Sequence, residues 1–112
     1  MQDPKPLRIG LVGCGGRGTG AAENCLVSAK NVELVALGDM FKDRLEQSRG
    51  YLAGTKHPGV KIEDKNCFLG FDAYKRVIDC DVDLVLFATP PGFRPMHVEA
   101  AVDAGKHVFM EK

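Results

Sequence analysis

The stretch Gly10–Gly20, "GLVGCGGRGTG", places six glycines in eleven positions. A glycine inside a helix costs about 1 kcal/mol relative to alanine, so helical sequences normally avoid this density. The glycines stand where an apolar strand, predicted at Leu7–Gly13, passes into a segment with helical spacing. A backbone free of side chains must therefore serve a purpose at this corner.

The rest of the 112-residue chain repeats the change from strand to helix. Strands are predicted at residues 32–38, 67–70, 83–89 and 107–112, and helical segments lie between them. The helical stripes are Ala22, Cys25, Leu26 and Ala29; Phe41, Leu45 and Leu52; Phe71, Tyr74 and Ile78; and Val98, Ala101 and Val102. Strands that are apolar on both faces predict a parallel sheet with helices on each side. We expect an α/β doubly wound Rossmann fold with strand order 3-2-1-4-5.

The amino-acid composition limits the classes of binding partner and the cellular locations that we expect for this protein. Fifteen basic residues balance fifteen acidic ones, so the net charge indicates neither nucleic acid nor an anionic membrane as partner. The longest apolar runs, such as Leu84–Ala88, fall far short of the roughly 20 residues that span a bilayer. The four cysteines are irregularly spaced without a C-x-x-C pair, which favours reduced thiols over a metal or redox site and agrees with a cytoplasmic location. The opening "MQDPKP" has no apolar signal segment, although a signal removed earlier leaves no trace.

Three of the glycines form the pattern G-x-G-x-x-G at the opening of the first helix. Gly13 permits the tight turn, Gly15 lets the backbone approach a pyrophosphate, and Gly18 allows the helix to pack closely on the strand. The amides at the helix start then face the phosphates, where the helix dipole favours negative charge. We predict a dinucleotide site at this corner, which also includes the intervening Cys14, Gly16 and Arg17.

An acidic residue ends the second predicted strand. Asp39 lies 21 positions after Gly18, close to the spacing expected for a carboxylate that binds the adenosine ribose, and Met40 is assigned to the same site. The alternative is that Asp39 caps a helix that begins near Phe41.

The same carboxylate bears on the choice of cofactor. Its negative charge repels a 2′-phosphate, so NAD is favoured over NADP. NADP stays open, because Arg17, Lys42 and Arg44 are near enough in sequence to supply a compensating positive charge.

Two later stretches, "FATPPGFRPMHVEAAVDAGKH" and "VFMEK", complete a pattern with the glycine corner and "LGDMF". Together they resemble the nucleotide-binding half of the Gfo/Idh/MocA family, the glucose-fructose oxidoreductases and inositol dehydrogenases, over nearly the whole chain. The resemblance implies an NAD(P)-dependent oxidoreductase that transfers a hydride to or from a hydroxyl of a sugar, polyol or related compound. Some relatives instead use NAD transiently in glycoside cleavage, and that activity is the alternative within the family.

The resemblance also implies roles for residues near the end of the chain. The turn Thr89, Pro90 and Pro91 would pass beside the cofactor, although many members carry asparagine where this chain has Pro91. His97 either lines the cofactor cleft or is structural. Glu111 would lie near the nicotinamide ribose, and Lys112 would be the catalytic lysine beside the reacting carbon.

Members of this family bind substrate on a second domain, and the 112 residues hold only one domain. We therefore expect residues 1–112 to be the Rossmann domain of a longer two-domain protein, inactive alone and part of a homo-oligomer when complete. Some relatives are exported with a twin-arginine signal, so export of the parent is an alternative to the cytoplasm. Outside the family, the alternatives are a non-catalytic nucleotide sensor and an S-adenosylmethionine-dependent methyltransferase domain.

Overall fold

The computed structural model describes residues 5–29, 31–88 and 94–110. Its strands are β1 (Leu7–Val12), β2 (Val32–Asp39), β3 (Cys67–Leu69), β4 (Leu84–Phe87) and β5 (His107–Met110). Its helices are α1 (Gly16–Ser28), α2 (Lys42–Gly54), α3 (Ala73–Asp79) and α4 (Arg94–Asp103), with a 3-10 turn η1 at Asp64–Asn66. The alternation of strand and helix is the one that the sequence predicts.

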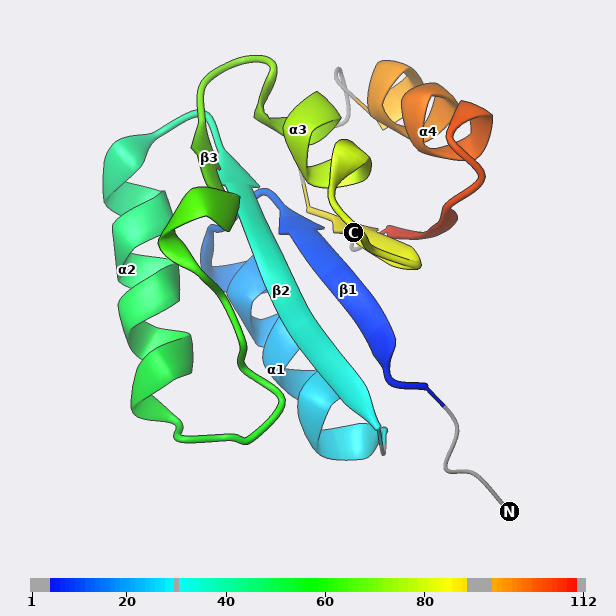
Figure 1. The fold of residues 1–112 in the computed structure, drawn as a ribbon. Coiled ribbons are helices and arrows are strands. Elements are labelled where there is room, and N and C mark those ends of the chain that lie inside the picture. Colours follow the sequence, from blue (N-terminus) through cyan, green and yellow to red (C-terminus); the bar gives the residue numbers. More distant parts are fainter. Residues whose placement is uncertain (1–4, 30, 89–93, 111–112) are drawn as a thin grey trace.

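The five strands form one parallel sheet in the order β3-β2-β1-β4-β5, which confirms the predicted Rossmann topology. In the central strand β1, Leu11 pairs with Leu37 of β2 and with Leu86 of β4. The order of the strands reverses between β1 and β4, and ligands of such sheets bind at the carboxyl ends of the strands beside this reversal. The glycine corner follows β1 at this edge (Figure 1).

Each face of the sheet carries its own apolar core. Helices α1 and α2 cover one face, where Leu11, Leu26 and Leu52 are fully or almost fully buried. Helices α3 and α4 cover the other face, where Val77 and Phe87 are fully buried. Because β1 and β2 are covered on both sides, residues 9–12 and 34–38 within them are continuous apolar runs instead of alternating ones.

Four residues that the helical stripes assign to the core are exposed instead, and one of them is Ala29, the C-cap residue of α1. Phe41 and Phe71 precede α2 and α3, and they are 55% and 56% exposed at the carboxyl edge of the sheet. Val102 is 60% exposed, because it lies about 100° around α4 from the fully buried Ala101. The predictions that these side chains face the core are therefore wrong. Spacing alone did not show that the two phenylalanines belong to loops.

Helix α1 approaches β1 so closely that Gly18 has no room for a side chain. A Cβ on Gly18 would lie 1.9 Å from the carbonyl oxygen of Gly13 and 3.1 Å from the Ala88 Cβ. We expect Gly18→Ala to lower the free energy of unfolding by about 2 kcal/mol or more, because backbone must move to relieve the overlap. Urea denaturation measures the loss.

Gly20→Ala is the matched control in the same helix, since a Cβ there meets nothing within 4 Å. Alanine has the higher helix propensity, so this variant should be neutral or more stable by up to about 1 kcal/mol. Equal stability of the two variants would contradict the close packing at Gly18.

Candidate cofactor-binding site

The glycine corner is a turn between β1 and α1. Gly13 has a φ of 94°, a conformation that favours glycine, and its N–H donates to the Gly38 carbonyl at 2.9 Å. Gly15 is the N-cap residue of α1, whose first turn contains Gly16 and the exposed Arg17. The amides at the start of this helix are therefore available to an anion.

Two glycines of the corner border open space. A Cβ on Gly15 or on Gly16 would meet no atom within 4 Å, whereas Gly18 is packed against the turn below. The backbone is thus bare on the outer side and tightly packed on the inner side. This geometry is a cradle that fits a diphosphate, whose oxygens need close backbone donors.

Asp39 joins the end of β2 to the glycine corner. Its side chain is only 6% exposed, and its Oδ2 accepts a hydrogen bond from the Cys14 N–H at 2.6 Å. Its Oδ1 accepts from the Phe41 N–H at 2.8 Å. Phe41 is the N-cap residue of α2 and no side chain caps that helix, so the alternative that Asp39 merely caps α2 does not describe its contacts.

Cys14 is held in the same corner as a neutral thiol. Its Sγ donates to the Gly38 carbonyl at 3.4 Å, and burial beside the negative Asp39 raises the pKa of the thiol to about 12. A thiol with this pKa is almost entirely protonated at neutral pH, so Cys14 lacks the thiolate that a nucleophile or metal ligand needs.

A hollow opens beside the corner, between the carboxyl ends of the strands and the starts of α2 and α3. Asp39 and Met40 contribute to its wall from β2 and the turn that follows it, and the exposed Phe41 and Phe71 stand at its rim. The Arg44 guanidinium lies 5.1 Å from the centre of the Phe41 ring. The lining residues are Val12, Gly13, Gly15, Asp39, Met40, Phe41, Arg44, Gly70, Phe71, Ala73, Tyr74, Ala88 and His97.

His97 both lines this hollow and packs as a structural residue. It is buried, and its ring stacks on Tyr74 with 4.1 Å between centroids and lies 5.6 Å from the Phe87 ring. Burial lowers the pKa of His97 below its usual value, so the ring is neutral at pH 7. The two interpretations from the sequence are therefore compatible.

Residues 7–112 match the family model described as "Oxidoreductase family, NAD-binding Rossmann fold", the Gfo/Idh/MocA family. The chain belongs to the Gfo/Idh/MocA family. A glycosyl hydrolase family 109 protein of Solibacter usitatus is 33% identical over 109 residues, which cover 94% of this chain and 24% of that protein. The myo-inositol 2-dehydrogenase of Thermotoga maritima is 34% identical over 106 residues, covering 95% of this chain and 28% of the relative.

Solved structures agree with this membership. The scyllo-inositol dehydrogenase of Lactobacillus casei, solved with NAD(H) and scyllo-inositol, superposes with a TM-score of 0.74 at 29% identity, covering 96% of this chain and 28% of that one. This Gfo/Idh/MocA domain thus spans about a quarter of the length of the relatives it matches. The membership favours the oxidoreductase over the methyltransferase alternative.

The structure places only some of the predicted site residues of this Gfo/Idh/MocA domain. It brings together the glycine corner, Asp39, Met40 and His97. Other predicted residues lie outside the described part of the chain, namely Thr89, Pro90, Pro91, Glu111 and Lys112. The sequence patterns did not predict that Phe41, Phe71 and Tyr74 line the hollow. An aromatic residue just after the end of a strand is a signal that could have indicated this.

The described ranges contain neither a membrane-spanning helix nor a cluster of metal ligands. Over residues 5–29, 31–88 and 94–110, no helix has the length and apolar character to cross a membrane. In the same part of the chain no three His, Cys, Asp or Glu side chains group as metal ligands. All four cysteines are free thiols.

The state of Cys14 can be tested by alkylation. At pH 8, iodoacetamide should modify the partly exposed Cys25, Cys67 and Cys80 of the native protein well before Cys14, because reaction requires an accessible thiolate. Mass spectrometry of tryptic peptides measures each rate, and protein unfolded in urea provides the control in which all four react. Labelling of Cys14 as fast as Cys67 in the native protein would contradict the buried, protonated thiol.

Proposed function

We propose that residues 1–112 are the dinucleotide-binding domain of a longer, two-domain NAD(P)-dependent oxidoreductase. The observation that carries the proposal is the 2.6 Å hydrogen bond between the Cys14 N–H and Asp39 Oδ2. It fixes the acid that ends β2 against the corner that follows β1, so one rigid unit offers both amide donors and a carboxylate acceptor. A dinucleotide needs these two groups side by side, donors for its diphosphate and an acceptor for its ribose hydroxyls.

The cofactor would lie across the carboxyl edge of the sheet. Its diphosphate would rest over Gly15 and Gly16 at the start of α1, where open space and free amides coincide. Asp39 has carboxylate lone pairs beyond the two that accept backbone N–H groups, and these would bind the ribose hydroxyls. The adenine would enter the hollow, where Met40, Phe41 and Phe71 offer apolar surface.

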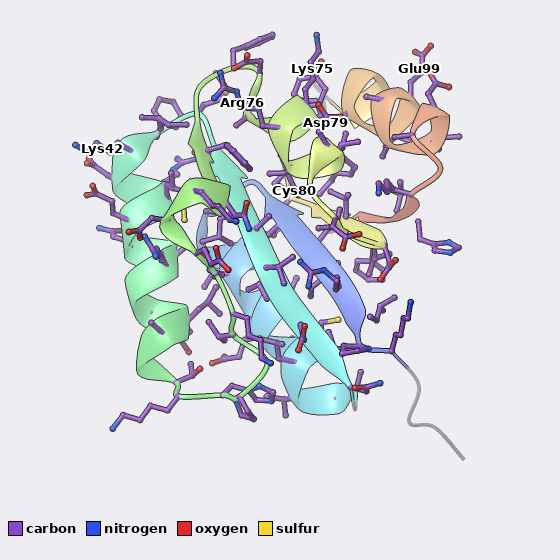
Figure 2. All side chains as sticks on the ribbon, in the orientation of Figure 1. Lys42, Lys75, Arg76, Asp79, Cys80 and Glu99 are labelled. Carbon is purple, nitrogen blue, oxygen red and sulfur yellow. The ribbon has the colours of Figure 1, made fainter. Side chains whose placement is uncertain are left out.

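NAD is the proposed cofactor, because Asp39 brings negative charge to the ribose site. Lys42 pairs with Glu46 at 3.9 Å and points away from the sheet at the start of α2 (Figure 2). Arg44 lines the hollow, so of these two α2 residues it is the one placed to compensate a 2′-phosphate. Binding of NADP is therefore the alternative, with Arg44 as its determinant.

The nicotinamide, when bound, accepts or donates a hydride, and the protein supplies orientation and proton transfer. We assign Lys112 to the reacting carbon, Glu111 to the nicotinamide ribose, and the turn of Thr89, Pro90 and Pro91 to the side of the cofactor. These five assignments rest on the resemblance to the family. The neutral His97, stacked on Tyr74, would support the wall of the hollow.

We propose a sugar or polyol hydroxyl as the substrate, bound with the help of a second domain, and a homo-oligomeric, cytoplasmic parent enzyme. Relatives named inositol 2-dehydrogenase support this substrate class. Relatives named glycosyl hydrolase family 109 protein, in Solibacter usitatus and Bacteroides fragilis, support NAD-assisted glycoside cleavage as the second candidate.

The ribose site can be tested with Asp39→Asn. Removing the charge should weaken NADH binding about tenfold and reduce the preference for NADH over NADPH, because an amide is a poorer acceptor and no longer repels a 2′-phosphate. Titration of NADH and NADPH fluorescence measures both affinities.

Asp43→Asn is the control, since it makes the same change at an exposed position in the first turn of α2. It should leave both affinities unchanged. If Asp39→Asn binds both cofactors like the wild type, the ribose site has been misplaced.

Two assays of the longer parent protein distinguish the oxidoreductase from the NAD-assisted glycosidase. With a polyol and NAD, an oxidoreductase accumulates NADH, which absorbs at about 340 nm. An NAD-assisted glycosidase releases the aglycone of a nitrophenyl glycoside without net NADH. The first result supports the oxidoreductase, and aglycone release without reduction of NAD contradicts it.

A further inference from the structure

We infer that the buried hydroxyls of Thr19 and Ser48 position the Gly15 amide for the diphosphate. The inference rests on the proposed dinucleotide site. Thr19 lies in α1 and Ser48 in α2, and both are buried. Neither belongs to the G-x-G-x-x-G pattern, and neither touches the hollow beside Asp39.

Every polar group of Cys14 is bound by a buried partner. Its N–H donates to Asp39 Oδ2, its Sγ donates to the Gly38 carbonyl, and its own carbonyl accepts from Thr19 Oγ1 at 3.1 Å. Of the four buried polar or charged residues in the described ranges, Thr19 and Asp39 bond Cys14 directly and Ser48 bonds Thr19. Because so many buried polar groups bond this one residue, we infer that its backbone is held in one orientation.

The carbonyl of Cys14 and the N–H of Gly15 belong to one peptide unit. No described peptide bond is cis, so these two groups point in opposite directions. Thr19 holds the carbonyl toward the interior between the helices, and the Gly15 N–H must then point outward. Among the described residues no backbone carbonyl accepts from this N–H, and a Cβ on Gly15, tested separately, would meet nothing within 4 Å.

The direction of the hydroxyl bonds follows from counting protons. Thr19 has one hydroxyl proton, which goes to the Cys14 carbonyl because a carbonyl cannot donate. The 2.8 Å contact between Thr19 and Ser48 therefore has Ser48 as donor. Ser48 thus fixes the rotation of the Thr19 hydroxyl and ties the orientation of the corner to α2. A chain of bonds runs from Ser48 through Thr19 to the peptide that carries the Gly15 N–H.

Thr19→Val tests this chain, because valine keeps the shape and loses the hydroxyl. We expect NADH affinity to fall about fivefold, while Thr19→Ser, which keeps the hydroxyl, stays within about twofold of the wild type. Adenosine lacks the diphosphate, so its affinity, measured by NMR titration, should be the same for all three proteins. In spectra of ¹⁵N-labelled protein, the Gly15 amide should shift strongly with NADH in the wild type and Thr19→Ser, and weakly in Thr19→Val.

Thr55→Val is the matched control. The Thr55 hydroxyl donates to the Leu52 carbonyl at 2.6 Å at the far end of α2, so its loss should affect stability without changing NADH affinity. If Thr19→Val does not fold, Ser48→Ala replaces it, with a smaller loss of NADH affinity expected because the Thr19 hydroxyl remains.

The outcomes separate the two claims. A wild-type protein that binds no NADH overturns the proposed function and this inference together. A wild type that binds NADH and a Thr19→Val that binds it equally well overturn only the inference. Equal losses for NADH and adenosine also overturn it, because they would show a general loss of structure instead of a misdirected amide.

Discussion

The hydrogen bond from the Cys14 N–H to the Asp39 carboxylate is the constraint on which the site depends. It joins the corner after β1 to the last residue of β2, 25 residues later in the sequence. A second bond from the same carboxylate to the Phe41 N–H fixes the entry to α2. The bond to Cys14 is buried and the bond to Phe41 is partly buried. A buried carboxylate without such donors would be costly, and hydrogen bonds to a charged acceptor are stronger than those between neutral groups. The glycine corner, the sheet edge and the second helix are thereby one unit.

Much of this arrangement follows from the sequence because it depends on local patterns. The alternation of apolar strands and helical segments predicts the parallel sheet and its order, since strands buried on both faces need helical crossovers. The spacing of Gly13, Gly15, Gly18 and Asp39 predicts that they meet, since carboxyl ends of neighbouring parallel strands share one edge. Their cofactor contacts stay predictions.

Other features depend on packing that spacing does not encode. Phe41 and Phe71 have the period of their helices but stand just before them, so a periodic pattern assigned them to the core. Thr19 and Ser48 look like ordinary helix residues until α1 and α2 are placed against each other, and only then do their hydroxyls meet. For His97 the sequence offered two roles, and its place between Tyr74 and the hollow accommodates both.

Asp39 has two roles, and this limits how the coenzyme preference of the domain could be redesigned. The carboxylate that would discriminate between the two coenzymes also anchors the loop that would grip their shared diphosphate. Replacing Asp39 to admit NADP would lower the affinity for both coenzymes. Selectivity and affinity could therefore not be changed independently at that position. Changes on the rim, where Arg44 lies over Phe41 and makes none of the hydrogen bonds that anchor the loop, offer a route that leaves the anchor in place.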